Sequence, residues 1–364
     1  MTTTPPTPGP RLRAVLSQLP AYQAGRPPAA VAGLTAYKIS SNENPYDPLP
    51  SVVDAVREAA QRINRYPDAG NTALREALSG FLGVPADWIA CGTGSLSVLG
   101  QIVDALCDAG DEVVYAWRSF EAYPIVVTLA GAVSVQVPLT ADHRHDLPAM
   151  AAAITERTKM VVICTPNNPT GTIVTAAELD DFLAQVPAHV VVVIDEAYLE
   201  FVADPAAPDA LAVLREHPNV VVLRTFSKAY GLAGLRVGYA VAHPEIAAAM
   251  YTTATPFGVN LIAQEAALAA LAAQDELHVR VKDLIAERDR VETGLAEQGW
   301  HLPASQANFV WFPLGADTPE FAAECERRAL AVRAFPQDGI RATIGEPEAS
   351  DRLLDIAAAW RRSH

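Results

Sequence analysis

The sequence contains few cysteines, no excess of basic residues and no long apolar run. Its four cysteines, Cys91, Cys107, Cys164 and Cys325, lie at no metal-ligand or CxxC spacing, so we expect free thiols in a reducing cytoplasm and no bound metal. The formal net charge of -15 argues against binding to nucleic acid or to an anionic membrane, because both require clustered cations. The opening MTTTPPTPGP lacks the features of a secretory signal, and no apolar run approaches membrane-spanning length.

The length of 364 residues exceeds the size at which one hydrophobic core usually stops growing, which predicts more than one domain. We interpret residues 1–45 as an N-terminal tail and arm that packs with the small domain. Residues 46–250 are predicted to form a large domain, and residues 251–364 a small C-terminal domain.

Short β-branched segments alternate with amphipathic helical segments in the predicted large domain. Strands are expected in DEVVYAW (111–117), KMVVIC (159–164), HVVVVID (189–195) and NVVVLRT (219–225). This alternation predicts the α/β class, with a mainly parallel, doubly wound sheet covered by helices on both faces. Ligands of such sheets bind beyond the carboxyl ends of the strands. After about residue 250, few strands alternate with helices, which predicts a small α+β domain.

Glycine-rich and polar motifs follow several of the predicted strands. CGTGSLS (91–97) leads into a helix and can offer backbone N–H groups to a phosphate, although such turns are as common without a ligand. TPNNPTG (165–171) holds Asn168 in a rigid turn, for which an Asx turn is the simpler interpretation. Asp195 ends a run of four valines and an isoleucine, so its carboxylate would be buried and would need a cationic partner.

A lysine follows another buried strand, in TFSKAYGLAGLRVG (225–238). A buried amine such as that of Lys228 shifts readily to a lower pKa and can condense with an aldehyde. A buried Asp195 can pair with a protonated pyridine nitrogen, and both groups together suit pyridoxal phosphate. Its phosphate would be held by Gly94, Ser95, Ser227 and Arg236.

Six motifs resemble those of fold-type I pyridoxal-phosphate aminotransferases and appear in the order known for that family. They are SNENPY (41–46), RYPD (65–68), TPNNPTG, DEAYLEF (195–201), TFSKAYGLAGLRVG and RATIG (341–345), and they cover nearly the whole chain. The sequence resembles most the class II branch that contains histidinol-phosphate and aromatic amino-acid aminotransferases. This resemblance implies that the domain of residues 46–250 binds pyridoxal 5'-phosphate.

The resemblance also implies a role for each matching residue. The implied catalytic residues are Lys228, which would bond covalently to the cofactor, Asp195, which would pair with its ring nitrogen, and Tyr198. Further contacts to the cofactor are implied for Asn168 and Tyr198 at the ring hydroxyl, Phe120 against the ring, and Gly94, Ser95, Ser227, Arg236 and Tyr66 at the phosphate. The implied substrate-binding residues are Tyr22, Asn42, Phe257, Arg333 and Arg341, of which Arg341 would hold the carboxylate.

A homodimer with shared active sites is implied as well, because Tyr66 would reach the site of a second subunit. The implied reaction is a ping-pong transamination in which Lys228 moves the α-proton of the amino donor. The partners are then small molecules, an amino acid and a 2-oxo acid such as 2-oxoglutarate.

The residues expected around the substrate favour an aromatic amino acid, phenylalanine or tyrosine, as the donor. Relatives that resemble histidinol-phosphate enzymes often carry Asp or Asn and then Glu after the glycine turn, and tyrosines along the pocket. Here the turn continues with Leu96-Ser97, the pocket positions are Phe120 and Phe257, and only Tyr22 keeps a hydroxyl. Bare rings remove hydrogen-bond donors to a phosphate and suit a planar apolar side chain.

Several alternatives stay open at this point. Histidinol-phosphate aminotransferase is the nearest, because Arg333 and Arg341 suit a phosphate as well as a carboxylate. A pyridoxal-phosphate decarboxylase of a phosphorylated amino acid would share the same motifs. A ligand-sensing regulator with this fold should carry an added basic DNA-binding segment, and the N-terminal residues hold too few cations for one. An NAD site is disfavoured, because CGTGSLS breaks the pattern G-x-G-x-x-G at its last glycine.

Overall fold

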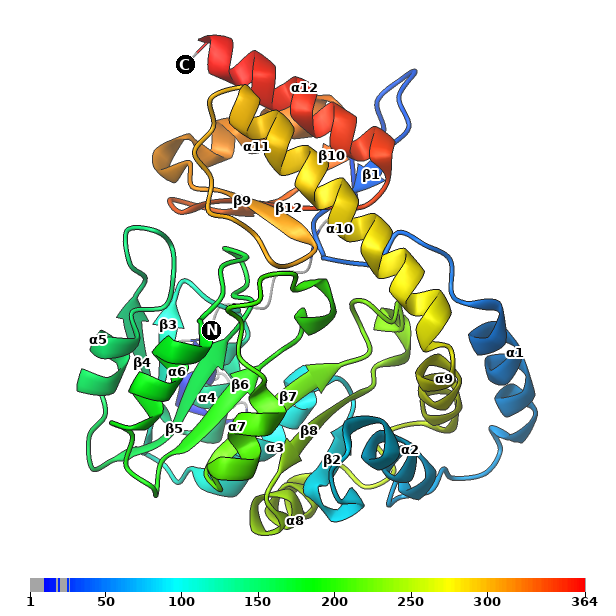
Figure 1. The fold of residues 1–364 in the computed structure, drawn as a ribbon, viewed down its shortest axis with the longest axis vertical. Coiled ribbons are helices and arrows are strands. Elements are labelled where there is room, and N and C mark those ends of the chain that lie inside the picture. Colours follow the sequence, from blue (N-terminus) through cyan, green and yellow to red (C-terminus); the bar gives the residue numbers. More distant parts are fainter. Residues whose placement is uncertain (1–9, 18, 20–24, 26, 364) are drawn as a thin grey trace, which may run out of the picture.

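The computed structural model describes residues 10–17, 19, 25 and 27–363. A seven-stranded sheet forms the centre of the large domain, with the strand order β2-β8-β7-β6-β5-β3-β4 (Figure 1). Its strands are β2 (Ile89–Gly92), β3 (Glu112–Trp117), β4 (Val133–Pro138), β5 (Thr158–Cys164), β6 (Val191–Asp195), β7 (Val220–Thr225) and β8 (Gly238–Ala242). Neighbouring strands are parallel except at β8, which runs antiparallel to both β7 and β2. The prediction of an α/β fold with a mainly parallel sheet is therefore confirmed.

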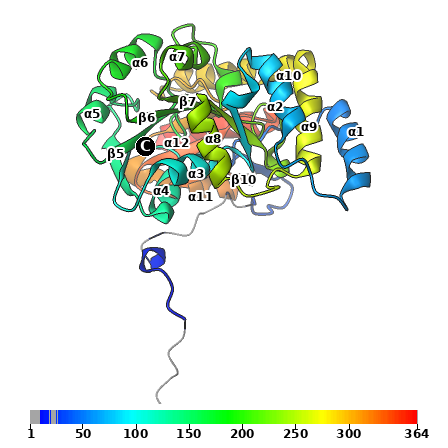
Figure 2. The same ribbon diagram turned by 90° about the horizontal axis from the view of Figure 1, so that it is seen from below.

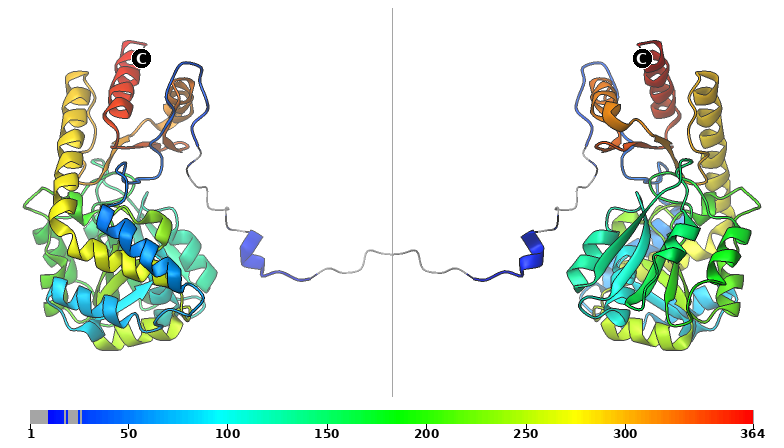
Figure 3. Two further views of the ribbon diagram at one scale, coloured as in Figure 1. Left: turned by 90° about the vertical axis from the view of Figure 1, so that its right-hand side faces the viewer. Right: turned by 90° about the vertical axis from the view of Figure 1, so that its left-hand side faces the viewer.

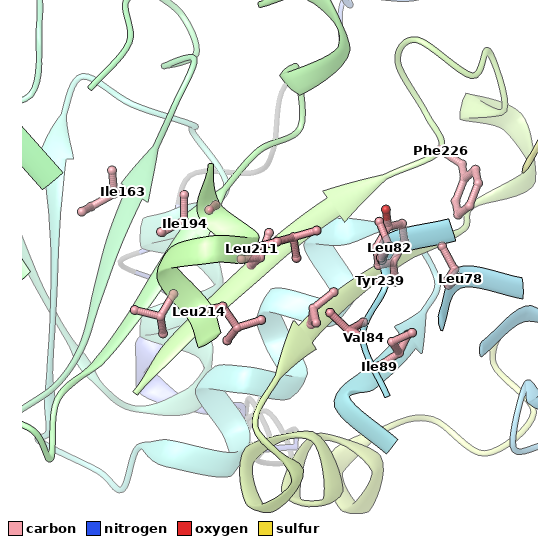
Figure 4. Packing of buried hydrophobic residues seen from close by; sticks show 14 of the residues in the cluster. Leu78, Leu82, Val84, Ile89, Ile163, Ile194, Leu211, Leu214, Phe226 and Tyr239 are labelled. Atoms are coloured by element: carbon pink, nitrogen blue, oxygen red, sulfur yellow. The ribbon is translucent and has the colours of Figure 1, made fainter. Parts of the chain in front are cut away.

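Helices cover both faces of this sheet, as the continuous apolar strands require (Figure 2). One face packs against α3 (Ser95–Leu106), α4 (Tyr123–Ala130) and α8 (Pro244–Thr253). The other face packs against α2 (Thr72–Leu82), α5 (Leu147–Ala152), α6 (Ala176–Leu183), α7 (Ala210–Glu216) and α9 (Leu261–Ala272). Figure 4 shows part of this second core, where Leu211 and Leu214 of α7 face Ile194 of β6.

The small domain contains a three-stranded antiparallel sheet in the order β11-β12-β9. The strands are β9 (Phe309–Phe312), β11 (Arg333–Phe335) and β12 (Gly339–Thr343), and the helices beside them are α11 (Thr318–Arg327) and α12 (Pro347–Ser363). The long helix α10 (Gln274–Glu297) runs from the large domain to the small one (Figure 3).

The positions of β1 (Tyr37–Lys38), α1 (Pro50–Ala59), α9 and α10 can be compared with the domain limits predicted at residues 45 and 250. The short strand β1 pairs with β10 (Leu330–Ala331) of the small domain, and α1 then packs against α9. Because α9 contributes to the core of the large domain, the chain leaves that domain in α10 and not at residue 250. Single 3-10 turns are η1 (Ala14–Ser17), η2 (Ala60–Arg62), η3 (Ala86–Trp88), η4 (Leu199–Phe201), η5 (Ala233–Leu235) and η6 (Gly315–Asp317).

Helix α6 shows how the sequence specifies these boundaries. Its N-terminal Thr175 accepts a hydrogen bond from the backbone N–H of Glu178, and the Glu178 carboxylate accepts one from the backbone N–H of Thr175, which completes a capping box. Within the described residues, no helix is both long and apolar enough to cross a membrane.

Candidate active site

A cavity of about 340 Å³ lies where the carboxyl ends of the central strands meet the small domain. Cys164, Asp195 and Thr225, the last residues of β5, β6 and β7, line one side of this central cavity. Arg333 of β11 and Arg341 of β12 line it from the small domain. The parallel arrangement of the strands thus brings the motifs that follow them to one place, as expected for a doubly wound sheet.

Lys228 follows β7 and reaches into the central cavity. Its Nζ donates a hydrogen bond of 3.0 Å to the backbone carbonyl of Ser41 and lies 5.8 Å from the centre of the Tyr198 ring. Burial, together with the nearby charge of Arg341, lowers the pKa of the Lys228 amine to about 7. An appreciable fraction of this amine is therefore uncharged near neutral pH, which is the form that reacts with an aldehyde.

Asp195 is 5% exposed and faces the same cavity. Its Oδ2 accepts a hydrogen bond of 2.7 Å from the Tyr123 hydroxyl, and its Oδ1 accepts one of 3.2 Å from the backbone N–H of Ala197. Burial raises the pKa of this carboxyl group to about 6, because these two bonds offset only part of the lost hydration. A cation placed beside Asp195 would restore the ionised form.

A cradle for an anionic group is formed where α3 begins. Gly94 precedes this helix with a φ of 89°, and the Nη1 atom of Arg236 donates a hydrogen bond of 3.3 Å to the Ser227 hydroxyl. A Cβ atom at position 94 would lie 2.4 Å from Nη2 of Arg236, so only glycine leaves room for the guanidinium here. Ser95, Ser227 and Arg236 all line the cavity, so the structure brings the predicted phosphate-binding residues together.

Four long-range hydrogen bonds join the small domain, the N-terminal arm and the large domain beside the cavity. Asn42 Nδ2 donates to the Tyr198 hydroxyl at 2.8 Å, and Thr343 Oγ1 donates to Asn42 Oδ1 at 3.0 Å. Arg341 donates to Asn168 Oδ1 at 2.5 Å and to the Ser40 carbonyl at 2.7 Å. These bonds fix residues that lie more than 150 positions apart in the chain.

Arg333 is held by a carboxylate that the sequence interpretation missed. Its Nη2 and Nε atoms lie 2.6 Å and 3.1 Å from Oε2 of Glu121, which also lines the cavity. The neighbouring Phe120 faces the cavity too, and its ring packs edge-on against Tyr123 at 5.5 Å. Tyr123 was missed as well, because a tyrosine within the apolar run of α4 is typical of a core residue.

Two other predicted residues, Tyr66 and Phe257, do not line this cavity in the described part of the chain. Tyr66 is 82% exposed and Phe257 is 44% exposed, and their rings pack against each other at 4.7 Å on the surface. Neither residue lines the central cavity of the described chain, so their predicted contacts with cofactor and substrate stay predictions. Tyr22 lies outside the described residues.

Metal-binding groups are not found in the described part of the chain, where no three His, Cys, Asp or Glu side chains could hold an ion. The four cysteines are unpaired, and burial raises the pKa of the Cys91 and Cys164 thiols to about 12.

Comparison with known proteins gives consistent matches over nearly the whole chain. Residues 36–356 match the family model described as aminotransferase class I and II. Proteins named aromatic amino acid aminotransferase from Streptomyces avermitilis and Streptomyces coelicolor are each 56% identical over 353 residues, which is 97% of this chain and 98% of the relative.

Solved structures match the fold to a similar extent. The crystal structure of histidinol-phosphate aminotransferase from Sinorhizobium meliloti in complex with pyridoxal-5'-phosphate superimposes with a TM-score of 0.87 at 31% identity. The match covers 98% of this chain and 99% of that one. The fold expected from the six motifs is therefore confirmed over both domains.

Proposed function

Because the chain belongs to the class I and II aminotransferases, as its motifs predicted, we propose that it transfers the amino group of an aromatic amino acid to 2-oxoglutarate with pyridoxal phosphate as cofactor. The observation that carries the proposal is that a lysine with a lowered pKa and a buried carboxyl group with a raised pKa line one cavity. The cofactor's chemistry uses an uncharged amine beside its aldehyde and a buried carboxylate beside its protonated ring nitrogen, and a bound pyridinium would favour the ionised form of Asp195.

The residues of the cavity fit pyridoxal phosphate. Asp195 offers a buried carboxylate to a protonated ring nitrogen, and the N-terminus of α3 with Ser227 and Arg236 offers donors to a phosphate. Lys228 offers an amine to an aldehyde, and a volume of about 340 Å³ suits a ligand of this size.

Lys228, Asp195 and Arg341 then each have a separate role in transamination. When bound, pyridoxal phosphate supplies the aldehyde and the electron-withdrawing ring. Lys228 Nζ takes the α-proton of the donor and returns it, which its pKa of about 7 allows near neutral pH. Asp195 keeps a proton on the ring nitrogen, and Arg341 holds the substrate carboxylate through two parallel N–H groups. The small domain closes one side of the cavity and limits the access of water.

An aromatic donor is supported by the relatives and by the cavity wall. The two Streptomyces relatives carry the name aromatic amino acid aminotransferase, and Leu96 and Phe120 add apolar surface to the cavity. Ser97 does not line the cavity, so only Leu96 of the Leu96-Ser97 pair can favour an aromatic side chain by direct contact. An apolar wall accepts a planar ring and gives a phosphate no hydrogen bond.

The test is kcat/KM for phenylalanine, tyrosine and histidinol phosphate with 2-oxoglutarate on one preparation of the loaded enzyme, with CO₂ release followed in parallel. We expect the two aromatic amino acids to exceed histidinol phosphate by about a hundredfold, or about 2.7 kcal/mol of discrimination. A preference of the same size for histidinol phosphate would overturn the proposal, and CO₂ release would indicate a decarboxylase. Lys228→Ala is the control, since it should lose both turnover and the visible absorption of the loaded enzyme.

We propose that the active enzyme is a homodimer in the cytoplasm, in which Tyr66 and Phe257 face the site of the partner. The surface around Tyr66 includes Ile63, which is 66% exposed, and a neighbouring hollow is lined by Pro67 and Leu261. Exposed apolar side chains grouped in this way mark interaction surfaces. Mixing equal amounts of Lys228→Ala and Tyr66→Ala subunits should restore about a quarter of the wild-type activity. Random pairing makes about half of the dimers mixed, and each mixed dimer keeps one intact site of two. Failure of the mixture to recover activity would place Tyr66 in the site of its own chain.

A further inference from the structure

The ion pair between Glu121 and Arg333 lies inside the cavity and not on the outer surface. The Arg333 side chain is 12% exposed and the Glu121 side chain 30% exposed, and both residues line the central cavity beside Phe120. The distance of 2.6 Å between Nη2 and Oε2 is that of a charge-assisted hydrogen bond. A partly buried pair of this kind is screened by solvent less than a surface pair.

The position of Arg333 in the sheet explains why a carboxylate is useful there. In the antiparallel pairing of β11 with β12, Arg333 lies directly opposite Arg341. Residues opposite each other on neighbouring strands point to the same face, and two like charges in this arrangement destabilise the sheet. Glu121 offsets one of these two positive charges, whereas the Nη atoms of Arg341 donate to the neutral oxygens of Asn168 and Ser40.

We propose that Glu121 is a specificity-determining residue, which neutralises Arg333 and thereby disfavours substrates that carry an anionic group at the end of their side chain. The proposal rests on the proposed function, because it assumes that Arg341 holds the carboxylate of an amino-acid substrate. Arg333 is then the cation that a second anionic group would meet. An uncharged ring leaves the Glu121–Arg333 pair intact, whereas a side-chain carboxylate must compete with the Glu121 carboxylate for the guanidinium and lies close to that negative charge.

The same argument separates the substrates of the two half-reactions. An aromatic side chain has no anionic group that pairs with Arg333, so Glu121 does not oppose the binding of such a donor. The acceptor 2-oxoglutarate carries a second carboxylate and should bind less tightly because of Glu121. Glu121 therefore determines specificity through repulsion as well as through its hold on Arg333.

Glu121→Gln is the decisive variant, because glutamine has nearly the same shape and can still accept a hydrogen bond from Arg333 while it lacks the charge. In the loaded enzyme, assayed as the half-reaction without an added oxo acid, we expect the ratio of kcat/KM for glutamate to that for phenylalanine to rise about tenfold or more. The change should appear mainly in KM, since the groups that move protons are untouched. Glu121→Asp keeps the charge and should retain most of the discrimination.

Two comparisons separate this effect from a general loss of negative charge or of structure. Glu43→Gln removes another carboxylate that lines the same cavity but pairs with Lys38, and it should not change the ratio selectively. In an Arg333→Gln background, Glu121→Gln should have no further effect on the ratio, because the cation that it exposes is gone.

A binding measurement checks the proposal without turnover. Glutarate and 3-phenylpropanoate, which lack an amino group, serve as inhibitors of the loaded enzyme. The inhibition constant of glutarate should fall in Glu121→Gln while that of 3-phenylpropanoate stays within about twofold. An unchanged ratio of kcat/KM together with unchanged inhibition constants would refute the role of Glu121. A wild-type preference for histidinol phosphate would instead refute the proposed function, so the two failures are distinguishable.

Discussion

Replacing Asp195 by asparagine should stabilise the cofactor-free protein near neutral pH although it removes activity. Asp195 is 5% exposed, and burial raises the pKa of its carboxyl group from 3.8 to about 6. A difference of about two pH units corresponds to about 3 kcal/mol, which the folded protein loses when this carboxylate is ionised.

The sign of the pH dependence follows from the direction of the shift. Because the pKa of Asp195 is higher in the folded than in the unfolded protein, folding is favoured while the group holds its proton. This contribution is complete below pH 3.8 and is lost as the pH rises to about 6. Asparagine does not ionise, so its contribution to the free energy of unfolding does not change with pH in this range.

The substitution also changes the hydrogen bonds of this side chain. The two carboxylate oxygens accept from the Tyr123 hydroxyl and from the N–H of Ala197, and an amide has only one oxygen to offer. If the Tyr123 hydroxyl then accepts from the amide nitrogen, the loss is about 1 kcal/mol, which leaves a net gain of about 2 kcal/mol. This gain corresponds to an increase of a few degrees in Tm, about 2–4 °C for each kcal/mol in domains of comparable size.

Thermal unfolding of the cofactor-free proteins at about pH 7.5 and about pH 4.5, at one protein concentration, tests the prediction. Asp195→Asn should unfold at a higher temperature than wild type at the higher pH, and this difference should shrink at the lower pH. Added pyridoxal phosphate should stabilise wild type more than the variant, because only wild type offers a charge to the ring nitrogen. Asp209→Asn is the matched control, since Asp209 caps α7 at the surface. A variant that is equally destabilised at both pH values would refute the reasoning.

Three further predictions follow from the same structure. Gly94→Ala places a Cβ atom 2.4 Å from Arg236 Nη2 at a φ of 89°, so the affinity for pyridoxal phosphate should fall about tenfold or more, as measured by titration of the cofactor-free protein. Arg288→Met leaves the carbonyls of Phe201 and Ala307 without their buried donor and should lower the free energy of unfolding in urea by about 2–5 kcal/mol. The rate at which the cofactor-free protein takes up pyridoxal phosphate should rise as the pH passes through about 7, because Lys228 reacts uncharged; a rate that does not change across this range would contradict the lowered pKa.

The part of the site that lies at the strand ends could be predicted from the sequence because its geometry is a property of the fold. Apolar strands mark the parallel sheet, and residues directly after such strands must converge at one edge. Asp195, Lys228 and Asn168 come together in this way. Leu211 and Leu214, by contrast, face the apolar core and carry no chemistry, as the periodicity of α7 indicates.

The remainder of the site depends on contacts that no local pattern encodes. The hydrogen bond between Asn42 and Tyr198 joins residues 156 positions apart, and only the family motifs suggested that both belong to one site. Tyr123 was missed because an apolar helical segment does not reveal which of its polar side chains faces a cavity, and Glu121 was missed because it lies in the turn before α4, where a carboxylate is usually solvated. Phe257 packs against Tyr66 on the surface, a contact that depends on the three-dimensional course of the segment between α8 and α9 and that no local pattern predicts.

The division between the two domains explains how substrate preference can differ while the chemistry is kept. The groups proposed to hold the cofactor and to move protons, Asp195 and Lys228, belong to the large domain, whereas Arg333 and Arg341 belong to β11 and β12 of the small domain. A substitution beside Arg333 changes which side chain is accepted without displacing the lysine or the buried carboxylate. The histidinol-phosphate aminotransferase from Sinorhizobium meliloti shares the fold with a TM-score of 0.87 at 31% identity. Under the proposal for Glu121, its ion pair with Arg333 selects against anionic side chains at a place apart from the residues proposed to move protons.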